Sequence, residues 1–166
     1  MIILLNGSIN SGKTTVGRRL AALLPRAAHV EVDALREFVA RLPLDEAIPV
    51  SLENAASVAR NLARRGFDVV LTYPLGVEDY AYLCARFADL DTTVHAVTLG
   101  PPLAVALAER GERRLSDHER RRIREQYADN RHRPPFGITI DNGAQTPDET
   151  AAAILLAVGR GEELAP

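Results

Sequence analysis

Residues 1–15 read MIILLNGSINSGKTT, a short apolar run followed by a loop of glycine and small polar residues. The apolar run, residues 2–6, has the composition of a buried strand, and a helical pattern begins at about Lys13. Between them, residues 7–14 satisfy GxxxxGK[ST], the pattern of a phosphate-binding loop, in the strand, loop and helix context that this loop requires. We therefore predict that the phosphates of a nucleoside triphosphate bind here.

The positions of this loop have distinct predicted roles. Glycine at both ends lets the backbone curl so that successive N–H groups point at phosphate oxygens, and the helix N-terminus adds its positive dipole end. Lys13 is expected to reach the β- and γ-phosphates, the Thr14 hydroxyl to bind Mg²⁺, and Thr15 to support the α-phosphate side. The predicted nucleotide-binding residues of the loop are Gly7, Ser8, Ile9, Asn10, Ser11, Gly12, Lys13, Thr14 and Thr15.

The distribution of basic residues supports a working loop. Of the 20 lysines and arginines, Lys13 is the single lysine and the other 19 are arginines. The exception falls where a compact ammonium group on a flexible stem is needed and a planar guanidinium would fit poorly. A chance match to the motif does not predict this.

Composition limits the classes of protein that this chain can belong to. Its 166 residues predict one domain over 1–166, and no apolar run approaches the ~18 residues of a membrane span, so we expect a soluble protein. The apolar start is too short for a signal-peptide core. A single cysteine, Cys84, excludes an internal disulfide and fits a reducing cytoplasm. The net charge of −2 argues against a broad nucleic-acid footprint.

Strand-like and helical patterns alternate along the chain, which predicts an α/β fold with a parallel sheet covered on both faces. The predicted strands are residues 2–6, 29–32, 67–72, 93–99 and 137–140. The predicted helices cover about 13–24, 34–41, 52–65, 77–87, 102–110, 116–130 and 147–158. The segment 43–49 has the weakest pattern, and we expect a loop there.

The second predicted strand ends in a pair of carboxylates, Glu31 and Asp33, which share one face because they are two residues apart. Ligands of open parallel sheets lie beyond the carboxyl ends of the strands, where Asp33 is expected. A carboxylate there can accept a hydroxyl proton or hold a Mg²⁺-bound water; alternatively, Asp33 caps the following helix. Arg36, one turn later, is a candidate for orienting the acceptor or a plain surface residue.

Nine of the 19 arginines lie between residues 110 and 133. The stretch 109–115 joins two predicted helices and suits a lid, at about 110–118, that brings guanidinium groups onto transferring phosphate. The arginines of 120–124, with Glu119 and Glu125 beside them, are expected to form a solvated helix face, with nucleic-acid contact as the minority interpretation. His118 is interpreted as a neighbour of the helix cap.

With these features in place, the chain resembles the small P-loop kinases, which include shikimate kinase, chloramphenicol phosphotransferase and the nucleoside monophosphate kinases. The resemblance covers nearly the whole length and implies a five-stranded parallel sheet of order 2-3-1-4-5. It implies that Asp33 is the base or lies in the Mg²⁺ shell, that Arg110 stacks near adenine, and that Arg114 approaches the phosphates. Residues 141–149 are similar to the segment that closes the adenine pocket in this group.

The sequence also departs from these families. Residues 69–74, VVLTYP, lack the acidic residue that many P-loop proteins place on the third strand for Mg²⁺, which places more weight on Thr14 and Asp33. The arginine set with which shikimate kinases grip a carboxylate has no convincing match.

The leading hypothesis is an ATP- and Mg²⁺-dependent kinase that phosphorylates a hydroxyl of a small metabolite or antibiotic-like compound. Its predicted catalytic residues are Lys13, Asp33, Arg110 and Arg114, and its predicted substrate-binding residues are Asp33 and Arg36. A nucleoside or nucleotide kinase, or a P-loop ATPase switch without a small acceptor, are the alternatives. We expect a monomer or homodimer.

Overall fold

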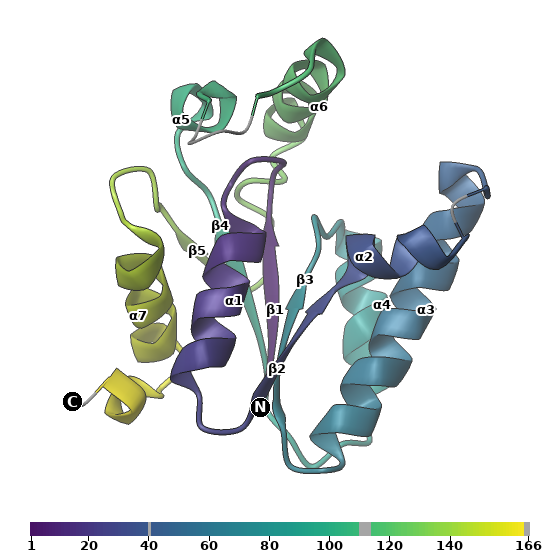
Figure 1. The fold of residues 1–166 in the computed structure, drawn as a ribbon, viewed down its shortest axis with the longest axis vertical. Helices are drawn as coiled ribbons and strands as arrows, with labels where there is room; N and C mark the ends of the chain where they lie inside the picture. Colours follow the sequence, from purple (N-terminus) through teal and green to yellow (C-terminus); the bar gives the residue numbers. More distant parts are fainter. Residues whose placement is uncertain (40, 110–113, 165–166) are drawn as a thin grey trace.

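The computed structural model describes residues 1–39, 41–109 and 114–164, and its centre is a five-stranded parallel sheet of order β2-β3-β1-β4-β5 (Figure 1). The strands are β1 (Ile2–Gly7), β2 (Ala27–Glu31), β3 (Asp68–Thr72), β4 (Val94–Leu99) and β5 (Ile138–Ile140). The strand order that the resemblance implied is confirmed.

The central strand, β1, shows why the sequence forms this sheet. It pairs in parallel with β3 on one side and β4 on the other, with Ile2 opposite both Val69 and Val94. All six of its residues are buried. A strand covered on both faces requires the continuous apolar run that residues 2–5 provide, because neither face meets water.

Helices cover both faces of the sheet, and the core is divided accordingly (Figure 1). One core cluster joins Ile3 and Leu5 to Val16 and Leu20 of α1 and to Ile154 of α7. The opposite cluster joins the other face of the sheet to α3 and α4. The alternation of β1 side chains between these clusters fixes the position of the loop that follows it.

The helices that flank the sheet are α1 (Lys13–Leu23), α2 (Val32–Arg36), α3 (Leu44–Ala63), α4 (Val77–Phe87), α5 (Leu103–Leu107), α6 (Asp117–Ala128) and α7 (Pro147–Ala157). Two short 3₁₀ helices, η1 (Glu37–Val39) and η2 (Gly161–Leu164), follow α2 and α7. None of the helices in the described ranges is both long and apolar enough to cross a membrane.

The predicted loop at 43–49 is wrong, because these residues form the beginning of α3. Pro43 is the N-cap, Asp45 and Glu46 lie in the first turn, and Pro49 lies inside the helix. Acidic residues near the positive helix end stabilise such a start, and the burial of Ala47 ties the first turns to the molecule. The interior proline removes one backbone donor, a cost that the tertiary packing of α3 offsets.

The predicted helix at 34–41 is also shorter and earlier than expected. It begins at Val32, directly after β2, and passes into η1 at Glu37. The predicted lid boundary is displaced at its end, because residues 117 and 118 belong to α6. Residues 110–113, which include the first lid arginines, lie outside the described residues.

Helices α5 and α6 lie above the carboxyl ends of the strands (Figure 1). They have their own small apolar cluster of Ala106, Leu115 and Ile123, against which Ile9 packs. Because Ile9 belongs to the loop after β1, this cluster joins α5 and α6 to the predicted phosphate site.

Candidate active site

The loop after β1 has the backbone geometry of a phosphate-binding loop. Gly7 and Gly12 adopt φ angles of 149° and 95°, which strongly favour glycine. A Cβ atom at Gly7 would lie 2.5 Å from Ser11 Oγ and 2.7 Å from the Leu99 carbonyl oxygen. The first glycine is therefore required by both conformation and space.

Lys13 and the start of α1 supply the positive charge of the site. The Lys13 Nζ donates to the carbonyl oxygens of Gly7 and Ser8, at 2.9 and 2.8 Å. These bonds fold its ammonium group over the loop. Helix α1 begins at Lys13, with Gly12 as N-cap and no side-chain cap bond. The positive end of its dipole therefore faces the phosphate loop as well.

The apex of the loop is fixed by α5 and α6. The Asn10 side-chain amide donates to the carbonyl oxygens of Ala106 and Ala108, each at 2.9 Å. Gln126 of α6, which is buried, accepts a hydrogen bond from the Ile9 N–H at 2.9 Å. Asn10 has a φ of 61°, a conformation that asparagine tolerates better than most residues. These contacts hold the loop open around the space where phosphates are expected.

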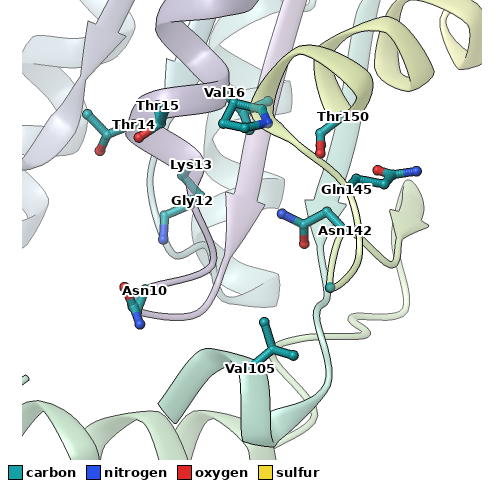
Figure 2. A pocket seen from close by; sticks show the side chains of 12 residues that line it. Asn10, Gly12, Lys13, Thr14, Thr15, Val16, Val105, Asn142, Gln145 and Thr150 are labelled. Atoms are coloured by element: carbon teal, nitrogen blue, oxygen red, sulfur yellow. The ribbon is translucent and has the colours of Figure 1, made fainter. Parts of the chain in front are cut away.

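A cavity of about 580 Å³ extends from the loop between α1, α5 and the segment after β5 (Figure 2). Val105 of α5 and Asn142 of the segment after β5 both line it. The Asn142 amide donates to the Ser11 carbonyl oxygen at 3.0 Å and so joins the two loops. Among the described residues, Ser11 Oγ and Asn142 Oδ1 are buried without a hydrogen-bond partner. The size and polar rim fit a nucleotide.

A second, smaller cavity of about 210 Å³ brings together residues that lie far apart in the sequence. Lys13 and Thr14 line it with Glu31, Asp33 and Thr72; the other lining residues are Ile9, Asn10 and Pro74. The Thr14 hydroxyl donates to Glu31 Oε1 at 2.5 Å. The Thr14 hydroxyl, which is predicted to bind the metal, therefore contacts a carboxylate at the end of β2.

The donor set fits Mg²⁺ held jointly with phosphate. Among the residues that the structure describes, no cluster of three or more His, Cys, Asp and Glu forms a metal site by itself. Mg²⁺ in phosphoryl-transfer sites takes one or two carboxylates or hydroxyls from the protein and completes its shell with phosphate oxygens and water. Thr14, Glu31 and Asp33 provide such a partial set.

Asp33 lies in the first turn of α2, and the N-cap position is held by Glu31, which makes no side-chain cap bond. The Asp33 carboxylate pairs with the Arg36 guanidinium at 3.2 Å. Both side chains are partly exposed and line a third cavity, of about 430 Å³, which shares Glu31 and Asp33 with the 210 Å³ cavity. The predicted pair thus lies where an acceptor can reach it.

Thr72, at the end of β3, takes the place of the acid that is missing from that strand. Its hydroxyl lies 3.0 Å from His29 Nε2, beneath α1. Gly17 permits this approach, because a Cβ there would lie 2.8 Å from His29 Nε2. Burial lowers the pKa of His29, with Arg18 acting in the same direction and Glu31 opposing it. A neutral imidazole therefore supports the floor of the site.

Tyr73 follows Thr72 and is buried beside the acceptor side of the site. Burial raises the pKa of Tyr73 to about 12; Asp33 and Asp79 add to this, and Arg36 and Arg131 oppose it. The phenol therefore remains protonated at neutral pH, with charged groups of both signs near it.

Arg114, the one predicted lid arginine that lies in the described residues, is not placed with the phosphate loop. Arg114 pairs with Glu109 at 3.3 Å, its side chain is 85% exposed, and it lines none of the three cavities. Arg110 lies outside the described residues, so its role stays a prediction. Of the arginines further along, Arg120 donates to the Leu107 carbonyl oxygen at 2.9 Å and braces α5 against α6.

Sequence reasoning missed three contacts that shape the site. The Glu31–Thr14 contact joins residues 17 positions apart. The prediction that Glu31 and Asp33 share one strand face is wrong, because β2 ends at Glu31 and Asp33 lies in the first turn of α2. Gln126 and Asn142 reach the loop from 117 and 131 residues away. No local pattern identifies such contacts, because they depend on how α6 and the β5–α7 segment pack.

Comparison with known proteins gives no matching family model and no matching curated protein. Solved structures do match. The APS kinase CysC of Mycobacterium tuberculosis, in complex with AMPPNP and APS, is 21% identical over 95% of this chain and 96% of its own, with a TM-score of 0.71. Shikimate kinase of Acinetobacter baumannii, in complex with shikimate, is 23% identical over 95% and 92%, with a TM-score of 0.63. A tunicamycin resistance protein of Deinococcus radiodurans is 21% identical over 95% of both chains, with a TM-score of 0.65.

These likenesses extend over nearly the whole of each chain, so they concern the complete domain and not the phosphate loop alone. They confirm that the chain has the fold of the small P-loop kinases.

Proposed function

We propose that this protein is an ATP- and Mg²⁺-dependent phosphotransferase that moves the γ-phosphoryl group of ATP to a hydroxyl of a small metabolite or antibiotic-like compound. One observation carries the proposal. Lys13 and Thr14 of the phosphate loop share a single small cavity with Glu31 and Asp33, so a phosphate-binding end meets a carboxylate end. The kinase fold supports the same conclusion.

In the proposed reaction, the acceptor oxygen attacks the γ-phosphorus, an O–P bond forms, and the bond to the bridging oxygen of ADP breaks. Asp33 accepts the proton that the acceptor hydroxyl loses. Lys13 and the backbone N–H groups of the loop neutralise charge on the phosphate oxygens. The protein contributes mainly position and charge, because phosphoryl transfer needs little covalent chemistry from it.

Mg²⁺ would be held by the Thr14 hydroxyl, with Glu31 and Asp33 as the nearest carboxylates. When bound, it neutralises phosphate charge during transfer. Glu31 takes the part that an acid on β3 has in many P-loop proteins, because its carboxylate already contacts the Thr14 hydroxyl.

The two larger cavities are assigned to different substrates. The 580 Å³ cavity beside Val105 and Asn142 is proposed for the nucleoside, and the 430 Å³ cavity beside Asp33 and Arg36 for the acceptor. Both border the 210 Å³ cavity beside the phosphate loop. The 580 Å³ cavity shares Thr14 with it, and the 430 Å³ cavity shares Glu31 and Asp33 with it. With this assignment the γ-phosphate would lie between the nucleoside and the acceptor hydroxyl, as in-line transfer requires.

The test is a screen of hydroxyl compounds, nucleosides and nucleotides for acceptor-stimulated release of ADP. Stimulation by small alcohols, but not by nucleosides or nucleotides, supports the proposal. Stimulation by nucleosides or nucleotides favours the nucleotide-kinase alternative. Basal hydrolysis that no small compound changes, but that a protein or RNA partner alters, favours an ATPase switch.

A further inference from the structure

The cavity proposed for the acceptor is lined by both carboxylates and apolar side chains. It continues outward from the phosphate site, because Glu31 and Asp33 line both the 210 Å³ and the 430 Å³ cavities. Its lining residues are Glu31, Asp33, Ala34, Arg36, Glu37, Val39, Leu42 and Leu44. An acceptor whose hydroxyl lies at Asp33 must place the rest of its structure against this lining.

The charge of the lining disfavours an anion. Glu31, Asp33 and Glu37 supply three carboxylates, and Arg36 supplies one guanidinium. That guanidinium is already paired with Asp33 at 3.2 Å. A carboxylate, sulfate or phosphate on the acceptor would therefore face net negative charge, and such repulsion acts strongly in a confined site.

Arg131 is the main potential counter-argument, because its charge acts on Tyr73 near the inner end of the cavity. There, however, Asp33 and Asp79 act on the pKa of Tyr73 more strongly than Arg36 and Arg131 do. Arg131 does not line the acceptor cavity. No surplus of positive charge is left for an anionic acceptor among the described residues of the lining.

The lining of the cavity also includes apolar side chains. Val39, Leu42 and Leu44 line it, and Leu42 and Leu44 expose 41% and 62% of their surface. Phe38, between two lining residues in sequence, is 80% exposed. Apolar side chains gathered beside one cavity mark a binding site for apolar surface.

We propose that the acceptor is an uncharged or cationic hydroxyl compound with an apolar portion, and that it carries no carboxylate, sulfate or phosphate group. Its hydroxyl lies at Asp33, its apolar portion lies on Val39, Leu42 and Leu44, and Glu37 excludes anions. This inference rests on the proposed function, since it assigns that cavity to the acceptor. It distinguishes the chain from the shikimate kinase of the same fold, because shikimate is a carboxylate.

Three probes that differ only in charge test the proposal. 4-(Hydroxymethyl)benzoate, 4-(hydroxymethyl)benzamide and 4-(aminomethyl)benzyl alcohol share one hydroxyl and one ring, and carry charges of −1, 0 and +1. Their binding is measured by saturation-transfer NMR or calorimetry in the presence of AMPPNP and Mg²⁺. We expect the neutral and cationic probes to bind at least ~10-fold more tightly than the anion.

Two pairs of exposed-site variants assign the preference to this cavity. Glu37→Arg is expected to remove or reverse the discrimination against the anion, whereas Glu53→Arg, the same change on an exposed position of α3, is expected to leave it unchanged. Leu44→Ser is expected to weaken binding of the neutral probe ~10-fold. Leu156→Ser is the matched control, because Leu156 is 64% exposed on α7 and Leu44 is 62% exposed.

Equal or tighter binding of the benzoate, or no binding of any probe, would overturn the inference. The inference would also be overturned if the Glu37 and Leu44 variants behaved as their controls do. Failure of the proposed function is distinguishable, because binding does not need transfer. A protein that binds the neutral and cationic probes but never phosphorylates a hydroxyl compound supports the acceptor class and contradicts the kinase reaction.

Discussion

Lys13 is the residue on which nucleotide turnover depends most directly. Its ammonium group lies over the loop, in contact with the Gly7 and Ser8 carbonyl oxygens, where phosphate oxygens are expected. Lys13→Met keeps the length of the side chain but removes the charge. We expect a fall in ATP turnover on the order of 10²–10³ with an unchanged fold. Steady-state ADP release and circular dichroism check both parts, with Arg86→Met as the control, and near-normal turnover would refute the assignment.

Substitution of Asp33 tests proton transfer separately from nucleotide binding. Asp33→Asn preserves shape and removes the basic carboxylate, so we expect transfer to fall ~10²–10⁴-fold while ATP binding stays near normal. Single-turnover transfer and nucleotide titration measure the two effects separately. Asp45→Asn, in the first turn of α3, is the matched control. If Asp33→Asn retains full transfer, the carboxylate only stabilises α2.

Glu31 is the residue that the structure adds to the sequence-based set. Glu31→Gln keeps an acceptor for the Thr14 hydroxyl but removes the negative charge beside the proposed Mg²⁺ site. We expect the Mg²⁺ concentration for half-maximal activity to rise several-fold, with a smaller change in the KM for ATP, because one of few protein ligands is weakened. Titration with Mg²⁺ at fixed ATP checks this. A Mg²⁺ dependence identical to that of Glu53→Gln would show that Glu31 has no part in metal binding.

At the scale of elements, α6 supports the phosphate loop although it lies far away in sequence. Gln126→Met retains the unbranched shape of the side chain but leaves the Ile9 N–H without its acceptor. We expect a loss of about 1–3 kcal/mol in unfolding free energy and a higher KM for ATP. Urea unfolding and steady-state kinetics measure these, and Asn61→Met, on the exposed side of α3, is the control. Unchanged values for both quantities would mean that α6 does not position the loop.

The elements also show what the sequence predicts well. β1, α1 and the loop between them follow from one continuous pattern, because apolar residues, glycines and Lys13 lie next to one another in the chain. The start of α3 was missed because Pro49 and weak periodicity disguised a helix stabilised by the burial of Ala47. Local propensity cannot register such tertiary stabilisation. The Glu31 and Gln126 contacts were missed for the same reason.

At the scale of the whole molecule, three histidines predict how stability changes with pH. Burial lowers the pKa of His29, His95 and His132 from 6.5. The unfolded chain therefore takes up protons at a higher pH than the folded chain does. Stability that is fully present above about pH 6.5 is lost as the pH falls through the lowered values. Urea unfolding from pH 8 to pH 5 should show this loss.

His29 is the most buried of the three, so it is the best position at which to check the sign of the effect. In His29→Gln, the loss of unfolding free energy between pH 6.5 and pH 5 should be smaller than in the parent protein. Equal slopes in the parent and the His29 variant would show that His29 does not contribute.

The fold of the whole molecule was predictable because alternating strands and helices leave few topologies, and the order 2-3-1-4-5 was carried by the family resemblance. The cavities proposed for the nucleoside and the acceptor were predictable only in part: residues 141–149, Asp33 and Arg36 were named from the sequence, but the segments that complete each lining depend on tertiary packing. Residues 10–16 meet 142–150 in one cavity, and Glu31 meets Leu44 in the other.

Transfer of labelled phosphate from [γ-³²P]ATP tests the central claim most directly. The protein is incubated with Mg²⁺ and a neutral or cationic hydroxyl compound that binds the acceptor cavity, and the organic product is separated from inorganic phosphate. The proposed function predicts label on the hydroxyl compound, at a rate that depends on its concentration and that Asp33→Asn depresses. Label that appears only as inorganic phosphate, at a rate unaffected by any hydroxyl compound, would contradict it.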